Sequence, residues 1–180
     1  MKKLFAALLS LCLMITGVAA IAENAADTAE PTVINISDYE SKIAATEGQV
    51  GNIAKTGLEM FVPAEFKDTE LSPEAEANGT FMVLKVDDKD VAVTAQVVKM
   101  DIEKFAAVAA ADGHNPLPVV INGVKYVAFN LAEEGKVAAV FALSTTDGNT
   151  LVFTYACTEN LKDAYTDTFK MMVASMQPSK

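Results

Sequence analysis

The chain has few side chains that could act as a nucleophile or a base. It contains one histidine, His114, and two cysteines, Cys12 and Cys157. A serine or cysteine nucleophile normally needs a histidine beside it as general base, and a single histidine in a loop is usually a surface residue. The motifs GxSxG, HExxH and CxxC and a phosphate-binding glycine loop do not occur. We therefore predict no catalytic residues.

The residue types in the sequence also argue against a metal site. A zinc site needs three or four ligands, which one histidine and one cysteine do not supply. Asp87, Asp88 and Asp90 could offer oxygens to Ca²⁺, but the spacing D-x-[DN]-x-[DN]-G is missing and Lys89 adds an opposing charge. We interpret these aspartates as a solvated hairpin tip and predict neither a metal nor a cofactor.

Carboxylates near Pro63 leave one catalytic alternative open. Glu59, Glu65 and Asp68 surround this proline in the sequence. A pair of carboxylates can act as acid and base in glycoside cleavage, but their separation is a three-dimensional quantity. The chain has no tryptophan and only four tyrosines, which argues against a sugar-stacking cleft. A hydrolase of unrecognised type using these carboxylates is therefore the alternative hypothesis.

The stretch GLEMFVPAEFKD at residues 57–68 predicts a strand that ends in a corner. Alternate residues before the corner are apolar, namely Leu58, Met60 and Val62. This period is typical of a strand with one buried face. Pro63 has no N–H for a strand ladder, so the strand should stop there, and Phe66 should fold back to seal the sheet edge. We expect this corner to be structural.

Residues 1–22, MKKLFAALLSLCLMITGVAAIA, have the three parts of a secretory signal peptide: two lysines, an apolar run and small residues. Cleavage is expected after Ala22 or after Ala20. The apolar run is short for the about 20 residues that span a bilayer, which argues against a retained anchor. Cys12 follows a leucine rather than a small residue, which argues against lipidation. We predict a bacterial protein that is secreted or held in the cell envelope.

The charge of the exported chain limits its partners. Lys2 and Lys3 leave with the leader, so the 14 basic residues become 12 against 24 acidic ones, a net charge of −12. Nucleic acids and anionic membranes are bound by clustered Lys and Arg, so neither is expected as a partner. No stable membrane insertion is expected after cleavage. The remaining partners are an unknown protein or a small ligand.

Turn residues and hydrophobic patterns divide the rest of the chain into short elements. We expect a flexible acidic tether over 23–36, one domain over 37–180, and an exposed loop over 68–79 with a helical turn after Ser72. Helices are predicted over 37–45, capped by Ser37 and Asp38 and closed by Gly48, over 101–113, and over 159–176. Strands are predicted at 49–54, 58–62, 80–86, 91–98, 119–121, 124–131, 136–143 and 150–157.

The last four strands should form an antiparallel meander. Asn122-Gly123 favours a two-residue hairpin turn, and glycine-containing turns join the strands that follow. Bulky residues fall at odd positions: Val127, Phe129, Leu131, Val137, Phe141, Leu143, Leu151, Phe153, Tyr155 and Cys157. One face of this sheet is therefore predicted to be core. Cys157 lies on that face, and a buried cysteine is more often inert than reactive.

The C-terminal helix carries an apolar stripe. Its members are Leu161, Tyr165, Phe169, Met172 and Met176. This spacing is typical of a helix packed on a sheet. We interpret the methionines as core residues rather than as a copper site or a peptide groove. The fold class is therefore predicted to be α+β, an antiparallel sheet flanked by helices.

Several segments together resemble the PsbP-like superfamily: GLEMFVPAEF, the Asp-capped helix, VVINGVKYVAFNL, TLVFTYACTE and FKMMVASMQP. The resemblance covers about residues 48–178. It implies an antiparallel sheet flanked by helices and a history of binding roles, in photosystem II accessory proteins, a Ran-GTPase-binding protein and bacterial exported proteins. The motifs transfer no functional residue, and Phe66 replaces the tryptophan of the family's VPxxW step.

Two functional hypotheses follow. The first is an exported, non-enzymatic binding or accessory domain that uses a sheet face or the loop at 68–79. The second is the hydrolase at the Pro63 corner. The absence of a paired nucleophile and base favours the first. A deep pocket with convergent carboxylates would favour the second.

Overall fold

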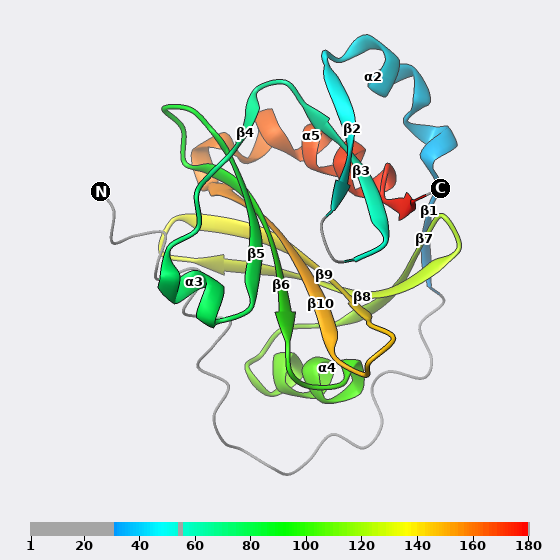
Figure 1. The fold of residues 1–180 in the computed structure, drawn as a ribbon, viewed down its shortest axis with the longest axis vertical. Coiled ribbons are helices and arrows are strands. Elements are labelled where there is room, and N and C mark those ends of the chain that lie inside the picture. Colours follow the sequence, from blue (N-terminus) through cyan, green and yellow to red (C-terminus); the bar gives the residue numbers. More distant parts are fainter. Residues whose placement is uncertain (1–30, 54–55, 180) are drawn as a thin grey trace.

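The computed structural model describes residues 31–53 and 56–179. Within these residues the chain forms an eight-stranded sheet, in the order β1-β7-β8-β9-β10-β6-β5-β4, and a three-stranded sheet, β11-β3-β2 (Figure 1). The predicted signal peptide lies outside the described residues, as do positions 54 and 55, where the strand predicted at 49–54 ends. The fold is α+β, as predicted.

The strands are β1 Thr32–Ile34, β2 Gly48–Ile53, β3 Leu58–Pro63, β4 Phe66–Asp68, β5 Thr80–Val86, β6 Val91–Val98, β7 Leu117–Ile121, β8 Val124–Glu133, β9 Lys136–Ser144, β10 Thr150–Thr158 and β11 Gln177–Pro178. The helices are η1 Ile36–Asp38, α2 Glu40–Ala45, α3 Pro73–Ala77, α4 Ile102–Ala111, η2 Glu159–Leu161 and α5 Lys162–Ala174. No helix among the described residues is long and apolar enough to cross a membrane.

The antiparallel meander of β7 to β10 is confirmed. Asn122 and Gly123 join β7 to β8 with φ angles of 47° and 82°, the positive values that a type I′ hairpin turn requires. A second two-residue turn, at Glu134 and Gly135, joins β8 to β9. β10 then pairs with β6 on its other side, which extends the sheet to β5 and β4.

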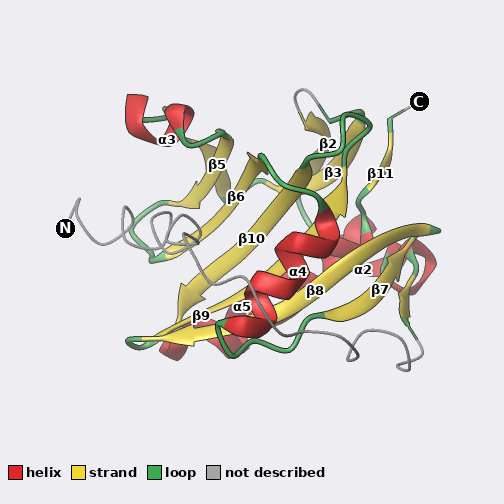
Figure 2. Cartoon of the chain, turned by 90° about the horizontal axis from the view of Figure 1, so that it is seen from below, coloured by secondary structure: helices red, strands yellow, loops and turns green. Residues whose placement is uncertain are grey.

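Both faces of the large sheet are covered. On one face α5 and the small sheet enclose a core that includes Phe153. On the other face α4 places Phe105 against Val152. Because Val152 and Phe153 are adjacent in β10, their side chains point to opposite faces. In Figure 2 α4 lies across the strands of the meander.

The bulky odd-numbered residues of β8 lie on the face of the sheet opposite to the one predicted. We expected the odd-numbered side chains of β8, β9 and β10 to share one core. This holds for β9 and β10, where Phe141 lies opposite Phe153. In β8, Phe129 lies opposite Val140, and both belong to the core under α4. The two-residue turn between β8 and β9 pairs odd-numbered with even-numbered residues, which reverses the parity.

The N-terminal boundary of the fold differs from the prediction. Thr32–Ile34 form β1, which pairs with β7 in parallel, so the tether predicted over 23–36 is too long. The predicted cap by Ser37 and Asp38 is wrong, because neither η1 nor α2 has a side-chain cap. Instead, the N–H of Ile36 is held by Asn122 Oδ1 at 2.8 Å. This hydrogen bond fixes the start of η1.

Gly48 opens β2 rather than closing the preceding helix. A Cβ atom at this position would lie 2.5 Å from Val62 O and 2.6 Å from the Phe61 ring. The glycine is therefore required by the close approach of β3, and the prediction of a helix stop at Gly48 is wrong.

The C-terminal helix is shorter than predicted. Residues 159–161 form the 3-10 turn η2, α5 ends at Ala174, and Gln177–Pro178 pair with β3 as β11. The predicted apolar stripe packs against the core throughout. Cys157 is 4% exposed, as predicted, and burial raises the pKa of its thiol. A raised pKa leaves little thiolate, the reactive form, near neutral pH.

Candidate functional site

The Pro63 corner connects the two sheets. β3 ends at Pro63, as predicted, and the chain enters the edge strand β4 of the large sheet at Phe66. Phe66 is 5% exposed and packs edge-on against Tyr165, with ring centroids 6.3 Å apart. It also contacts Phe169 of α5. The predicted burial of Phe66 is confirmed, and it seals the edge strand against α5.

The one-faced pattern predicted for β3 is only partly correct. Leu58 and Met60 are buried, as expected, but Phe61 is also buried and Val62 is only half-buried. The Phe61 ring lies over the Cα of Gly48, as the close approach at that glycine shows. Both faces of β3 therefore carry buried side chains, because β2 supplies space for an aromatic ring on the second face.

The three carboxylates of the hydrolase alternative have three different partners. Glu59 Oε1 accepts a hydrogen bond from Gln177 Nε2 at 2.8 Å. Glu65 Oε2 accepts one from the Tyr165 hydroxyl at 3.0 Å, and Asp68 Oδ1 accepts one from its neighbouring backbone N–H. None of these hydrogen bonds joins one of the three carboxylates to another. Each carboxylate therefore accepts a hydrogen bond from a different group.

The hairpin tip between β5 and β6 is linked to the corner by its lysine. Lys89 Nζ donates a hydrogen bond to the Tyr165 hydroxyl at 2.8 Å and lies 5.2 Å from the centre of that ring. The hydrogen bond to Tyr165, with a smaller contribution from Glu65, raises the pKa of Lys89. The three aspartates of the tip are exposed. Over residues 31–53 and 56–179, no group of three His, Cys, Asp or Glu residues is placed to hold a metal ion.

His114 is not a free surface residue. It is half-buried, and its ring stacks on Phe129 with centroids 5.3 Å apart and planes inclined by 13°. Sequence patterns place it correctly in the loop between α4 and β7. They gave no indication of the aromatic contact, because Phe129 was assigned to the opposite face of the sheet.

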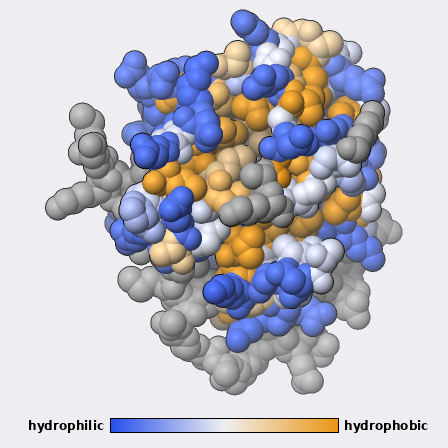
Figure 3. All heavy atoms as spheres, viewed as in Figure 1, coloured by the Kyte–Doolittle hydropathy of each residue, from blue (hydrophilic) through white to orange (hydrophobic). Residues whose placement is uncertain are grey.

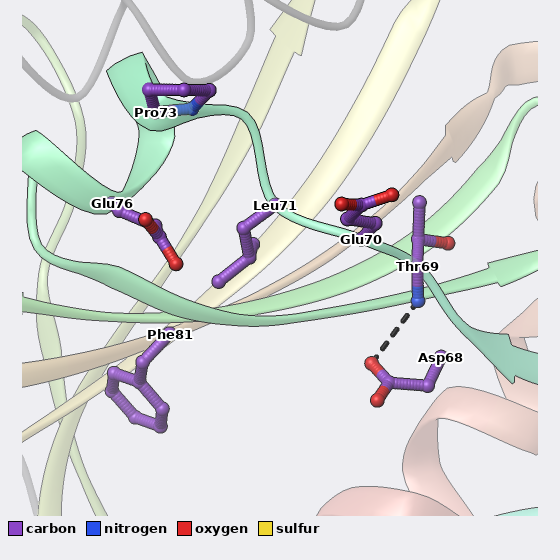
Figure 4. A pocket seen from close by; sticks show the side chains of 7 residues that line it. All are labelled: Asp68, Thr69, Glu70, Leu71, Pro73, Glu76 and Phe81. Atoms are coloured by element: carbon purple, nitrogen blue, oxygen red, sulfur yellow. Dashed lines mark hydrogen bonds between the residues drawn. The ribbon is translucent and has the colours of Figure 1, made fainter.

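A surface groove lies beneath the exposed loop at 68–79. It has a volume of about 480 Å³, and we call it the loop groove; it is lined by Asp68, Thr69, Glu70, Leu71, Pro73, Glu76 and Phe81 (Figure 4). The helical turn predicted after Ser72 is present as α3, and Ser72 Oγ accepts a hydrogen bond from the N–H of Ala75. The sequence therefore predicted the loop that builds the groove.

The loop groove combines hydrocarbon with negative charge. Leu71, Pro73 and Phe81 supply apolar surface, and Asp68, Glu70 and Glu76 supply carboxylates. In Figure 4, Glu76 and Leu71 point toward the strand that carries Phe81. Sequence reasoning did not single out Phe81, since its strand position gives no sign that the loop folds over it. Such a lining suits a ligand that carries both a cation and an apolar group.

The architecture is that of the PsbP-like proteins, an α+β fold in which helices and a small second sheet cover a large antiparallel sheet. Among solved structures, the solution structure of cyanobacterial PsbP (CyanoP) from Synechocystis sp. PCC 6803 is similar over 74% of this chain and 93% of its own, with 14% identity and a TM-score of 0.54. At this identity the likeness shows the fold alone.

Two further solved structures are similar over most of their length. A mutant of the protein Mog1 matches 74% of this chain and 97% of its own, at 10% identity and a TM-score of 0.44. LpqN of Mycobacterium tuberculosis, described as involved in cell envelope biogenesis, matches 84% and 100%, at 13% identity and a TM-score of 0.45. No protein-family model and no curated protein matches the sequence.

Proposed function

We propose that this chain is an extracytoplasmic binding domain without catalytic activity, and that the loop groove is its ligand site. The observation that carries the proposal is the lining of the groove, where apolar side chains meet three carboxylates and which contains no histidine, cysteine or serine. Residues 1–22, with the features of a signal peptide, support export. Binding sites of this kind fix a ligand by apolar contact and orient it by a few charges.

The ligand class follows from the two kinds of side chain. Among the described residues, Glu70 and Glu76 form no ion pair, so both carboxylates are available to a cation. Leu71 and Phe81 would contact the hydrocarbon next to that cation. A lysine side chain at the surface of a partner protein has this combination, because its aliphatic stem can pack while its ammonium group stays near the rim. We therefore propose a protein partner that presents lysine to the groove.

The experiment compares three forms of the exported chain as bait for envelope proteins of the native culture. The first is the wild type, and the second is Glu70→Gln with Glu76→Gln, which keeps the shape of the groove and removes two charges. The third is Glu103→Gln with Glu159→Gln, a control with the same net charge and both changes at exposed sites outside the groove.

A partner recovered with the wild type and the control, but at least about tenfold less with the groove variant, is the expected result. Its recovery should also fall as salt is raised, because exposed charges are screened. Equal recovery by all three forms would show that the groove is not the site.

A further inference from the structure

The outer edge of β2 carries backbone groups that no described residue pairs. β2 pairs with β3 on one side, with Val50 opposite Phe61. The N–H of Phe61 donates to Ser175 Oγ at 2.9 Å, so Phe61 turns its backbone groups away from β2. Val50, opposite it, must therefore turn its own N–H and C=O to the outer edge. The same holds for Gly48 and Asn52, which lie two residues before and after.

β2 lacks the features that normally protect an edge strand. Its sequence GQVGNI has no charge and no proline, and its register with β3 contains no bulge. Val50 is 59% exposed. In Figure 3, hydrophobic surface extends into the upper part of the molecule. This is the region where Figure 1 shows β2 and β3. The edge is therefore a template for an added strand.

The surface of β2 is also open at Gly51. Apart from its two chain neighbours, no described heavy atom lies within 4 Å of the position that a Cβ would take. No described segment therefore covers β2 at this point.

We propose that β2 pairs with β2 of a second copy of this chain, antiparallel about a two-fold axis at Val50. In this register Val50 faces the other copy's Val50, and Gly48 faces the other copy's Asn52. The outward-facing residues are symmetric about Val50, so each outward N–H meets a C=O of the other copy. The two exposed valine side chains then lie beside each other and cover one another from water.

The charges of the strand ends fit this pairing. The register places Glu47 opposite Ile53 and Gly51 opposite Gln49, so no like charges meet across the strand pair. The exported chain as a whole carries a net charge of −12, which repels a second copy at long range. Salt screens that repulsion. Dimerisation should therefore strengthen as salt is raised, the opposite of cation binding in the loop groove.

The test is sedimentation of the purified exported chain and two matched variants. Val50→Lys places two ammonium groups opposite each other across the two-fold axis. Val33→Lys is the control, because Val33 is also an exposed valine on an edge strand (58% against 59%). A single strand pair buries little surface, so the wild type should show a weak, concentration-dependent dimer. Val50→Lys should raise its dissociation constant at least about tenfold, and Val33→Lys should not.

A cross-link defines the register. In a hydrogen-bonded antiparallel pair the Cβ atoms are about 5.5 Å apart, beyond the roughly 3.5–4.5 Å of an unstrained disulfide but within reach of a short thiol-to-thiol cross-linker. Val50→Cys should therefore give a covalent dimer with a short bis-maleimide, and Val33→Cys should not. The proposal is overturned if the wild type stays monomeric up to millimolar concentration, if both lysine variants dimerise as the wild type does, or if Val50→Cys does not cross-link. Failure of this test leaves the loop groove untouched, since the groove lies on the other sheet.

Discussion

The two faces of the large sheet are packed in different ways. Under α5, one core gathers side chains from both sheets and from both ends of the chain, including Met60, Phe66, Ile121 and Met172. Under α4, the core is smaller and is drawn from a continuous part of the sequence, from Val98 to Val152. The first face therefore joins distant segments, and the second secures one helix to the strands that follow it. Removing a side chain from the core under α5 should destabilise the whole molecule. Removing one from the core under α4 should have a local effect.

The largest effect is expected for Phe66→Ala. Phe66 is buried against two aromatic rings of α5, and replacing a buried phenylalanine by alanine costs about 3–5 kcal/mol of stability. The free energy of unfolding is measured by chemical denaturation. Phe105→Ala removes the same group beneath α4, where it is 3% exposed. Its cost should lie at the low end of the same range, because a single helix can move into the cavity. Equal losses with global unfolding in both variants would contradict the distinction between the faces.

Much of this arrangement could be predicted from the sequence. Alternating apolar residues and the Asn122-Gly123 turn defined the meander. The short pairings were missed: β1 and β11 have three and two residues, too few to show a period. The face assigned to Phe129 was wrong because a two-residue turn reverses parity. In the loop groove, the loop was predicted, but the contribution of Phe81 depends on how the loop folds back over its strand.

Asn122→Gly should cause the second largest loss. The Asn122 side chain accepts from the N–H of Ile36 and donates to the carbonyls of Ala174 and Met176, each at 2.8 Å. Glycine keeps the positive φ of 47° and removes only these bonds. Leaving such groups unpaired should cost about 2–3 kcal/mol, measured by denaturation.

A matched turn position separates the side chain from the backbone. Glu134 has the same φ of 47° in the next hairpin turn and an exposed side chain. Glu134→Gly should cause no loss and should gain up to about 1 kcal/mol, because glycine adopts this positive φ without the strain that glutamate carries. A loss as large as that of Asn122→Gly would show that the turn backbone, rather than the bridge between η1 and the end of α5, is responsible.

A smaller effect is expected on the other face, at the start of α4. Asp101 Oδ1 accepts a hydrogen bond from the N–H of Lys104 at 2.7 Å, which caps the helix as the sequence predicted. Asp101→Ala should cost about 1 kcal/mol. Hydrogen exchange should increase within α4 while β10 stays protected, since the loss is local. Asp101→Asn, which can still cap, should restore most of the protection. Uniform loss of protection across the sheet would contradict the local role of this face.

A gain rather than a loss is expected at Tyr126, on the α5 face. Its hydroxyl is buried and has no hydrogen-bond partner in the part of the chain that the structure describes, and burial raises the pKa of Tyr126 to about 12. Removing an unpaired buried hydroxyl should stabilise the fold, so Tyr126→Phe is expected to gain about 1 kcal/mol at neutral pH. The pH dependence of stability tests the same group. The folded state favours the neutral Tyr126 hydroxyl, because its pKa lies above the ordinary tyrosine value near 10. Ionisation of Tyr126 therefore leaves stability unchanged below pH 10 and lowers it as pH rises from 10 to about 12, because the unfolded state loses its proton first. Tyr126→Phe should flatten the decline of stability in that interval, measured by urea unfolding at several pH values. Some decline should remain, because burial also raises the pKa of Tyr155. An unchanged slope would mean that the Tyr126 hydroxyl is hydrated in the folded protein, and the α5 face would then be less completely closed to water than its packing indicates.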